Sequence, residues 1–374
     1  MGIGHTQLSL TSPKFEWTVV LTGLFLAAVG LGLIYSATSP AGPAGRSFIL
    51  RQLTWCSLGL LVMGAFLVVD YHVLERWAVW LYVAIVVSLM VVWAVGNVTA
   101  GSKRWIDLGL MRFQPSEFAK LAVVVVLAKY FQGNPGRIAL GFLDLWRPLL
   151  LVAVPVGLVL IQPDLGTAVV IALVALGMIL FVGVARKVWF FAFGAGLIGV
   201  PLLVLMGDRL LLGYQKERLA TFLDPSFDPL GSGYHILQSQ IAIGSGGVFG
   251  KGFLHGTQNQ LMFLPVKHTD FIFSILAEEW GFVGCVAVLI VFCALFLRGL
   301  GIAAKARDGF GALLAFGCTS IIFWHVAINT AMVMGMVPVV GVPLSFLSYG
   351  GSSLVLSFLV LAVLANVSMR RFSY

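Results

Sequence analysis

The chain has 374 residues, of which 60% are apolar and only 10% are charged, and its mean hydropathy is +1.02. Soluble domains carry about a quarter charged residues, and a globular core of this length could not hide so much apolar surface from water. The composition excludes a soluble protein and predicts a membrane protein. The net charge of +8 does not indicate nucleic-acid binding, because the charges are scattered singly between apolar runs.

Ten apolar runs are long enough to cross a bilayer, which takes roughly 20 residues. The first run is too long for the apolar part of a signal peptide and is expected to be retained. The sequence predicts an all-α polytopic membrane protein, a single domain over 1–374, with spans near 17–37, 52–69, 77–96, 116–131, 148–162, 165–184, 187–207, 270–297, 309–334 and 350–369.

Basic residues indicate the orientation of the spans. Loops on the side of the N-terminus carry more Lys and Arg than the short loops on the other side, with Arg147, Arg186, Arg298 and Arg370 among them. Because short cytoplasmic loops are enriched in these residues, both termini are expected in the cytoplasm. The four cysteines lie in apolar runs without metal-ligand spacing and are expected to be packing residues.

The segment 208–268 is too long and polar for a simple connector and is expected to be a large extracytoplasmic loop. It contains a short helix with Tyr234, Leu237 and Ile241 on one side. The glycine-rich stretch GSGGVFGKG follows from Gly244, and such a stretch alone is weak evidence for phosphate binding.

Charged residues at helix ends on the outer side are the candidates for chemistry, because charge at membrane depth is costly. Asp270 enters the eighth span, where it is either a functional carboxylate or only an N-cap. Glu117 and Lys120 are three residues apart and favour an ion pair, whereas Asp164 in a Gln-Pro-Asp turn favours turn chemistry. Within spans, Glu278 and Glu279 are expected to anchor hydrogen bonds. His325 is expected to be a packed core residue.

Basic residues from three segments gather on the outer side, against the usual charge bias: Lys103, Arg104, Lys120, Arg218, Lys251 and Lys267. A polyanionic ligand at the outer leaflet would explain this arrangement. A carboxylate at a helix mouth beside such a cluster suits removal of a proton from a sugar hydroxyl.

Several long motifs, in a characteristic order and spacing, resemble the SEDS family (shape, elongation, division and sporulation). They are more similar to the branch of the family that acts in rod elongation than to the branch that acts in division. They are GSKRWIDLG with FQPSEFAKLA, IQPDLGTA, GSGGVFGKG, LPVKHTDFIFSILAEEWG and PLSFLSYGGSS. The sequence departs from the family just before His-Thr-Asp, where the family often has Glu-Arg or Glu-Ala: Val266 replaces the acidic residue, whereas Lys267 keeps a base. The resemblance implies polymerisation of the lipid-linked disaccharide lipid II into peptidoglycan glycan strands at the outer face of the bacterial cytoplasmic membrane.

The resemblance also assigns residues and partners. Asp270 matches the family's presumed general base, Glu117 and Lys120 match a supporting polar pair, and Arg218 matches an arginine of the long loop. Implied partners are lipid II and lipid-linked glycan, a class B penicillin-binding protein, MreC, MreD and MreB filaments. The full set of expected substrate-binding or supporting residues is Glu117, Lys120, Lys103, Arg104, Arg218, Gln238, Lys251, His255, Lys267, His268, Thr269 and Ser352.

Two other functions stay open at this point: a transporter that moves lipid II across the membrane, and a non-catalytic scaffold of the elongation machinery. A carrier places its site near the middle of the membrane, whereas these polar residues gather at one side. No obligatory cofactor is expected. A Mg²⁺ or Mn²⁺ ion, where one takes part, is expected to bind with the substrate diphosphate, since the sequence has no dedicated acidic metal cage.

Overall fold

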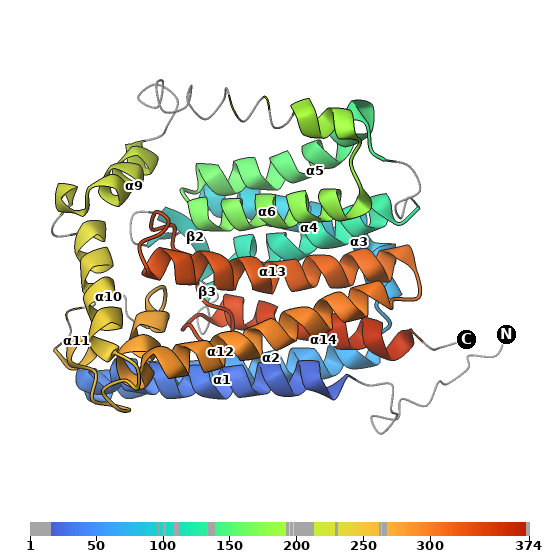
Figure 1. Ribbon diagram of the computed structural model, residues 1–374. Coiled ribbons are helices and arrows are strands. Elements are labelled where there is room, and N and C mark those ends of the chain that lie inside the picture. The colour runs from blue at the N-terminus through green and yellow to red at the C-terminus, as the bar shows by residue number, and fades with distance from the viewer. Residues whose placement is uncertain are drawn as a thin grey trace.

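The computed structural model is a helical bundle, as predicted, to which one small three-stranded sheet is added. It describes residues 16–371 except 96, 100–101, 108–111, 134–138, 192–193, 195–196, 198–212, 229–230, 262 and 264–267. The long helices run side by side (Figure 1): α1 (Trp17–Thr38), α2 (Pro43–Val68), α3 (His72–Val95), α4 (Pro115–Phe131), α5 (Phe142–Ile161), α6 (Leu165–Val182), α12 (Ile272–Ala304), α13 (Gly309–Val333) and α14 (Gly351–Arg370).

These helices coincide with nine of the ten predicted spans, while the seventh, 187–207, lies largely outside the described residues. Among the described residues, eight helices are long and apolar enough to cross a membrane. The helix α4 is not one of the eight, since it has only 17 residues and contains Glu117, Lys120 and Lys129. Its polar side chains are tolerated because protein encloses most of the helix: α4 packs against α3, α13 and α6.

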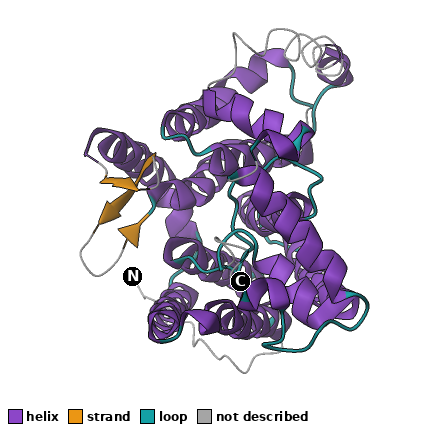
Figure 2. Cartoon of the chain, turned by 90° about the vertical axis from the view of Figure 1, so that its left-hand side faces the viewer, coloured by secondary structure: helices purple, strands orange, loops and turns teal. Residues whose placement is uncertain are grey.

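One end of the bundle is covered by the predicted extracytoplasmic loop. The helices α9 (Gly213–Leu223), α10 (Ser232–Gly246) and α11 (Thr257–Gln260), with the 3₁₀ turn η2 (Pro225–Phe227), lie across this end (Figure 1). Figure 2 looks onto it and shows the small antiparallel sheet of β1 (Asn97–Thr99), β2 (Ser102–Asp107) and β3 (Arg112–Phe113) at one side. On α10, Leu237 and Ile241 are exposed, in agreement with the predicted apolar side of this helix.

The glycine-rich stretch has a structural partner in α12. At Gly281 the backbone of α12 leaves helical geometry (φ 66°), so helical hydrogen bonds around it are lost. The stretch replaces them: Lys251 N and Gly252 N donate to the carbonyls of Glu278 and Glu279 (3.0 and 2.9 Å), and Phe282 N donates to Gly247 O (2.9 Å). This stretch therefore caps a helix break, which satisfies backbone groups that would otherwise be costly to bury.

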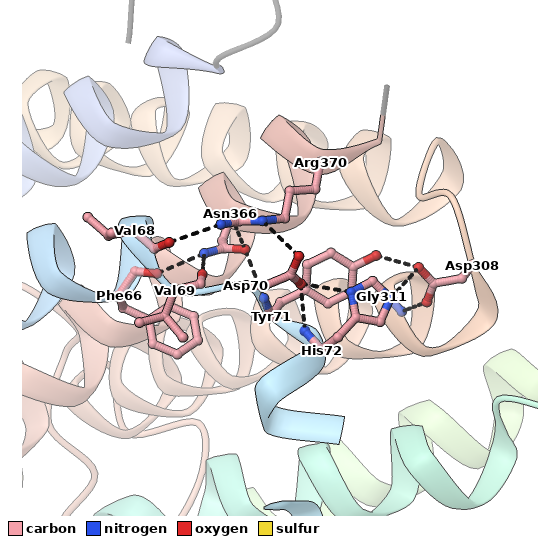
Figure 3. A network of polar contacts seen from close by, with 10 residues as sticks. All are labelled: Phe66, Val68, Val69, Asp70, Tyr71, His72, Asp308, Gly311, Asn366 and Arg370. Carbon is pink, nitrogen blue, oxygen red and sulfur yellow. Dashed lines mark hydrogen bonds and ion pairs between the residues drawn. The ribbon is translucent and has the colours of Figure 1, made fainter. Parts of the chain in front are cut away.

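The opposite end of the bundle is held by a polar network (Figure 3). The Asn366 amide on α14 donates to Phe66 O and Val69 O at the end of α2, and its oxygen accepts from Tyr71 N (3.2 Å). The Tyr71 hydroxyl donates to Asp308 at the start of α13. These contacts satisfy the last carbonyls of α2 and join three helices there.

Candidate active site at the α9–α11 end

Asp270 lies two residues before α12, and its side chain does not cap that helix. The N-cap residue of α12 is Phe271, so the alternative that Asp270 is only an N-cap is wrong. The Asp270 carboxylate is partly buried and accepts a hydrogen bond from the Thr269 hydroxyl. Its backbone carbonyl accepts a 2.8 Å hydrogen bond from the Asn329 amide of α13. Among the described residues, this carboxylate therefore stands at a helix start without a capping role.

Arg104 brings a cation to this carboxylate from β2. Its guanidinium donates to the backbone carbonyls of Gln162 (3.1 Å) and Pro163 in the hairpin between α5 and α6, and lies 3.8 Å from Asp164. Asp164 is the N-cap of α6, where it accepts from Thr167 N (3.3 Å), and it also accepts from Gln114 and Ser116. The predicted turn chemistry of Asp164 is confirmed, and the same residue anchors Arg104.

Arg218 lies on α9, one of the helices that cover this end of the bundle. Its guanidinium carbon lies 6.0 Å from the centre of the Tyr214 ring, one turn earlier on the helix. It is near enough to Arg104 to be repelled and near enough to Asp164 and Asp270 to be attracted. Its buried Nη1 finds no hydrogen-bond partner among the described residues. Two guanidinium groups and two carboxylates thus share this end of the bundle.

Burial and the neighbouring charges of Arg104, Arg218 and Asp164 set the proton affinity of Asp270. Burial raises the pKa of the Asp270 carboxyl to about 6, even though Arg218 and Arg104 pull it downward, and Asp164 adds to the increase. For Arg218, burial and repulsion by Arg104 lower the pKa. A carboxyl with a pKa near 6 is ionised at neutral pH and is a stronger base than an ordinary aspartate.

The segment 335–350, between α13 and α14, forms the other wall beside Asp270. Tyr349 N donates to His268 O (2.8 Å), and the Ser348 hydroxyl donates to Thr269 O (2.6 Å). Gly341 has a left-handed backbone (φ 73°), and a Cβ built there would come within 3.5 Å of Asp270 Oδ2. The His268 ring packs against Phe48 and Tyr349, with ring centres 4.9 and 5.5 Å away. The predicted residues His268 and Thr269 are therefore fixed by this segment.

Glu117 and Lys120 form the predicted ion pair, inside the bundle and fully buried. Lys120 Nζ lies 2.9 Å from Glu117 Oε1. It also lies 2.7 Å from Nε2 of His325 on α13, and Nδ1 of His325 is 2.9 Å from Pro343 O. His325 is buried as expected, but it is a hydrogen-bonded member of this group and not merely a packed residue. Nearby, Ser352 accepts from Gln114 N (3.1 Å), which joins α14 to the start of α4.

The structure places other predicted residues elsewhere. The Lys251 ammonium lies 2.7 Å from Glu278, which also accepts from Thr257 and Gln258 N, so this lysine belongs to the helix break of α12. His255 is exposed with Nδ1 2.8 Å from Phe253 O, and Gln238 is partly buried on α10. The predictions for Lys267 and for the Lys103 side chain lie outside the described residues. Glu279 accepts from Ser36 of α1, and with Glu278 it serves the expected anchoring role.

Sequence reasoning gave too little weight to Asp164 and His325, and missed Asn329 and Gln114. Asn329 and Gln114 are uncharged and lie inside apolar or mixed runs, so charge at membrane depth did not single them out. One signal was present in the sequence: His325 and Asn329 are four residues apart and therefore share a helix face. A polar pair on one face of an apolar helix indicates a partner that is itself polar.

The fold and the site define a class: a multi-span helical membrane protein with a buried carboxylate and two guanidinium groups at one end. Residues 16–372 match the family model FTSW_RODA_SPOVE, described as "Cell cycle protein". Peptidoglycan glycosyltransferase MrdB of Escherichia coli is 41% identical over 342 residues, 91% of each chain. Stage V sporulation protein E of Bacillus subtilis is 39% identical over 365 residues, covering 96% of this chain and 97% of that protein.

Solved structures agree with these relatives. The crystal structure of Thermus thermophilus rod shape determining protein RodA has a TM-score of 0.71 at 30% identity, covering 96% of this chain and 98% of that one. A structure described as "Structural coordination of polymerization and crosslinking by a peptidoglycan synthase complex" has a TM-score of 0.81 at 30% identity, covering 96% and 99%. The chain belongs to the FtsW/RodA/SpoVE family, the SEDS proteins.

Proposed function

We propose that this protein is a peptidoglycan glycosyltransferase that polymerises lipid II, acting in cell elongation. The observation that carries the proposal is the placement of Asp270, a carboxylate with a pKa of about 6, beside the guanidinium groups of Arg104 and Arg218. Relatives named as peptidoglycan glycosyltransferases, MrdB among them, support the reaction class.

The reaction joins two lipid-linked sugars with one base. The 4-hydroxyl of GlcNAc on lipid II attacks the anomeric carbon of a chain held on undecaprenyl diphosphate, and Asp270 takes the hydroxyl proton. The new β-1,4 bond forms with inversion as the α-linked diphosphate leaves. Glycosidases need a second carboxyl group to protonate an alkoxide leaving group. A diphosphate leaves without protonation, so a single base is sufficient.

The two arginines would stabilise the leaving diphosphate. Arg104 is already oriented by three oxygen atoms of the α5–α6 hairpin, whereas Arg218 has a buried Nη1 without a partner among the described residues. A phosphate oxygen would supply that partner and would relieve the repulsion between the two guanidinium groups. Bidentate recognition of phosphate by arginine suits this arrangement better than a lysine would.

A divalent cation fits this site only as part of the substrate. Among the described residues there is no group of three His, Cys, Asp or Glu side chains that could hold a metal ion. Mg²⁺ commonly binds through one or two carboxylates together with substrate phosphates. Asp164 and Asp270 would supply such carboxylates beside a bound diphosphate, and a Mg²⁺ or Mn²⁺ ion there would neutralise charge on the leaving group.

The proposed setting is the bacterial cytoplasmic membrane, with the α9–α11 end facing the exterior and both termini inside. The proposed partner is a class B penicillin-binding protein that crosslinks the product, in keeping with the peptidoglycan synthase complex among the similar structures. MreC, MreD and MreB filaments complete the proposed elongation machinery.

The test is Asp270→Asn, which keeps the size of the side chain and removes the base. Purified mutant, assayed on lipid II with a class B partner, should lose polymerisation by about 100-fold or more. Its thermal unfolding temperature should match the wild type, since Asp270 does not cap α12. Normal polymerisation by the mutant would falsify the assignment. Fluorescent lipid II in vesicles tests the transporter alternative: leaflet exchange without polymer would support a carrier, and polymer without exchange supports the polymerase.

A further inference from the structure

The helix α13 carries two buried polar side chains that face Asp270 and Lys120 together. His325 and Asn329 are 1% and 0% exposed and lie one turn apart on the same side of the helix. Burial of an imidazole and an amide inside a membrane bundle is unfavourable unless both are hydrogen-bonded. Their partners therefore show what the pair is built to hold.

Asn329 ties Asp270 to the 335–350 segment. Its single amide nitrogen donates at 2.8 Å to Asp270 O and at 2.8 Å to Val342 O. Both partners are carbonyl oxygens, so only the amide NH₂ can face them, which fixes the orientation of the side chain. Val342 follows Gly341, whose backbone lies against the Asp270 carboxylate. Asn329 thus fixes the residue and the wall beside it at the same time.

His325 ties the same segment to Lys120. Pro343 O, next to Val342, can only accept, so the proton of the imidazole belongs on Nδ1. Nε2 then presents a lone pair to the Lys120 ammonium at 2.7 Å, while Glu117 receives another of its protons. The lysine is therefore held from two helices, and His325 transmits its position to the 335–350 segment.

We propose that His325 and Asn329 are positioning residues for the transferase reaction: together they clamp the 335–350 segment between Lys120 and Asp270. Through this clamp the base keeps its orientation toward the acceptor hydroxyl, although neither residue touches substrate. The inference rests on the proposed function and adds to it two residues to which no role has been given.

The kinetic test separates positioning from binding. Asn329→Asp has the same shape but lacks the NH₂ group. The ionised carboxylate offers only oxygen atoms to the two carbonyls, and a protonated carboxyl can donate to one of them at most, so at least one of the two hydrogen bonds is lost. This variant should lower kcat for lipid II polymerisation by about 100-fold while KM changes by less than about threefold. His325→Asn retains a hydrogen-bond donor toward Pro343 O, and His325→Gln retains a polar group toward Lys120. Each should keep more activity than His325→Leu, which loses both.

The matched control is Thr330→Val. Thr330 is a buried neighbour of Asn329 on α13, but within the described part of the chain its hydroxyl bonds only to its own helix, at Val326 O (2.7 Å) and Ala327 O (3.2 Å). This variant should keep the wild-type kcat. Wild type and Asp270→Asn are run beside it, so that a failure of the proposed function appears as inactive wild type.

A second measurement does not depend on activity. Hydrogen–deuterium exchange should become faster in residues 335–350 and 268–271 of Asn329→Asp and His325→Leu, and stay unchanged in Thr330→Val. Unchanged exchange in residues 335–350 and 268–271 of the two variants would overturn the proposal. So would an unaltered kcat in Asn329→Asp and His325→Leu, provided that the wild type is active. A raised KM with retained kcat also overturns it, because that would make the pair part of substrate binding. So does recovery of the wild-type kcat at lower temperature, because the role would then be only structural.

Discussion

At the scale of single residues, the site depends on how protein surroundings change an ordinary aspartate. Burial raises the proton affinity of Asp270, and the nearby arginines limit the increase, so that the group is still ionised at neutral pH. An exposed aspartate would be ionised over a wider range but would be a weaker base. The structure thus combines base strength with ionisation under physiological conditions.

The pH profile of polymerisation should report this balance. As the proposed general base, Asp270 would act only when deprotonated, so kcat/KM should fall as the pH drops below about 6 and reach a plateau above it. Below the midpoint the fall should be about tenfold per pH unit. The measurement is the initial rate on lipid II between pH 5 and 8, with thermal unfolding measured at each pH as the control. A rate that stays flat down to pH 4.5 would contradict the role of Asp270.

Replacement of Arg218 should change two quantities together. In Arg218→Gln the loss of the proposed phosphate contact should raise KM for lipid II by about tenfold or more. The loss of a positive charge should move the acidic limb of the pH profile to higher pH, because Arg218 pulls the pKa of Asp270 downward. Arg218→Lys keeps the charge and should leave the limb in place while weakening binding. If Arg218→Gln moves neither quantity, Arg218 lies outside the working site.

At the scale of elements, the glycine-rich stretch supplies hydrogen bonds that the broken helix α12 lacks. The break in α12 leaves backbone groups unpaired, and the glycine-rich stretch pairs them from outside the helix. Gly250 and Gly281 approach so closely that a Cβ on Gly281 would stand 2.3 Å from Gly250 N. Only glycine fits this crossing, because both residues also have left-handed backbone angles.

Gly281→Ala should therefore destabilise the protein by about 2–4 kcal/mol, from overpacking and backbone strain together. The measurement is thermal unfolding of the purified protein in detergent. The matched control is Gly301→Ala on the same helix, where a Cβ would have open space and the mutant should be at least as stable as the wild type, because Ala favours a helix over Gly. Equal melting temperatures for both variants would show that the crossing tolerates a side chain.

At the scale of the whole molecule, the predicted orientation of the bundle in the membrane can be measured by labelling single introduced cysteines. In a Cys293→Ser background, which removes the exposed cysteine of the described structure, Asp224→Cys marks the α9–α11 end and Lys305→Cys the opposite end. A membrane-impermeant maleimide applied to intact spheroplasts should label position 224 directly. It should label position 305 only after the membrane is permeabilised. The reverse pattern would place the site in the cytoplasm and exclude lipid II polymerisation there.

Much of this molecule follows from its sequence. Long apolar runs predict helices because only helices satisfy their own backbone in lipid, and nine of the predicted spans are helices in the structure. Asp270, Arg104 and Arg218 were selected by charge, and the structure brings them together. The links between them could not be predicted in this way: the contacts of Asn329 with Asp270 O and Val342 O depend on tertiary packing of neutral groups.

The break in α12 also bears on how the chain enters the membrane during synthesis. The apolar stretch Ile272–Ala304 has 33 residues, which as one unbroken helix would be about 50 Å long, whereas the hydrocarbon core is about 30 Å thick. The insertion machinery must therefore select which part spans. Glu278 and Glu279 lie just before Gly281, and an acidic group placed at the centre of a span opposes insertion by about 2–3 kcal/mol. We therefore expect the membrane-spanning part of α12 to begin near Gly281, with both glutamates outside the centre of the hydrocarbon core.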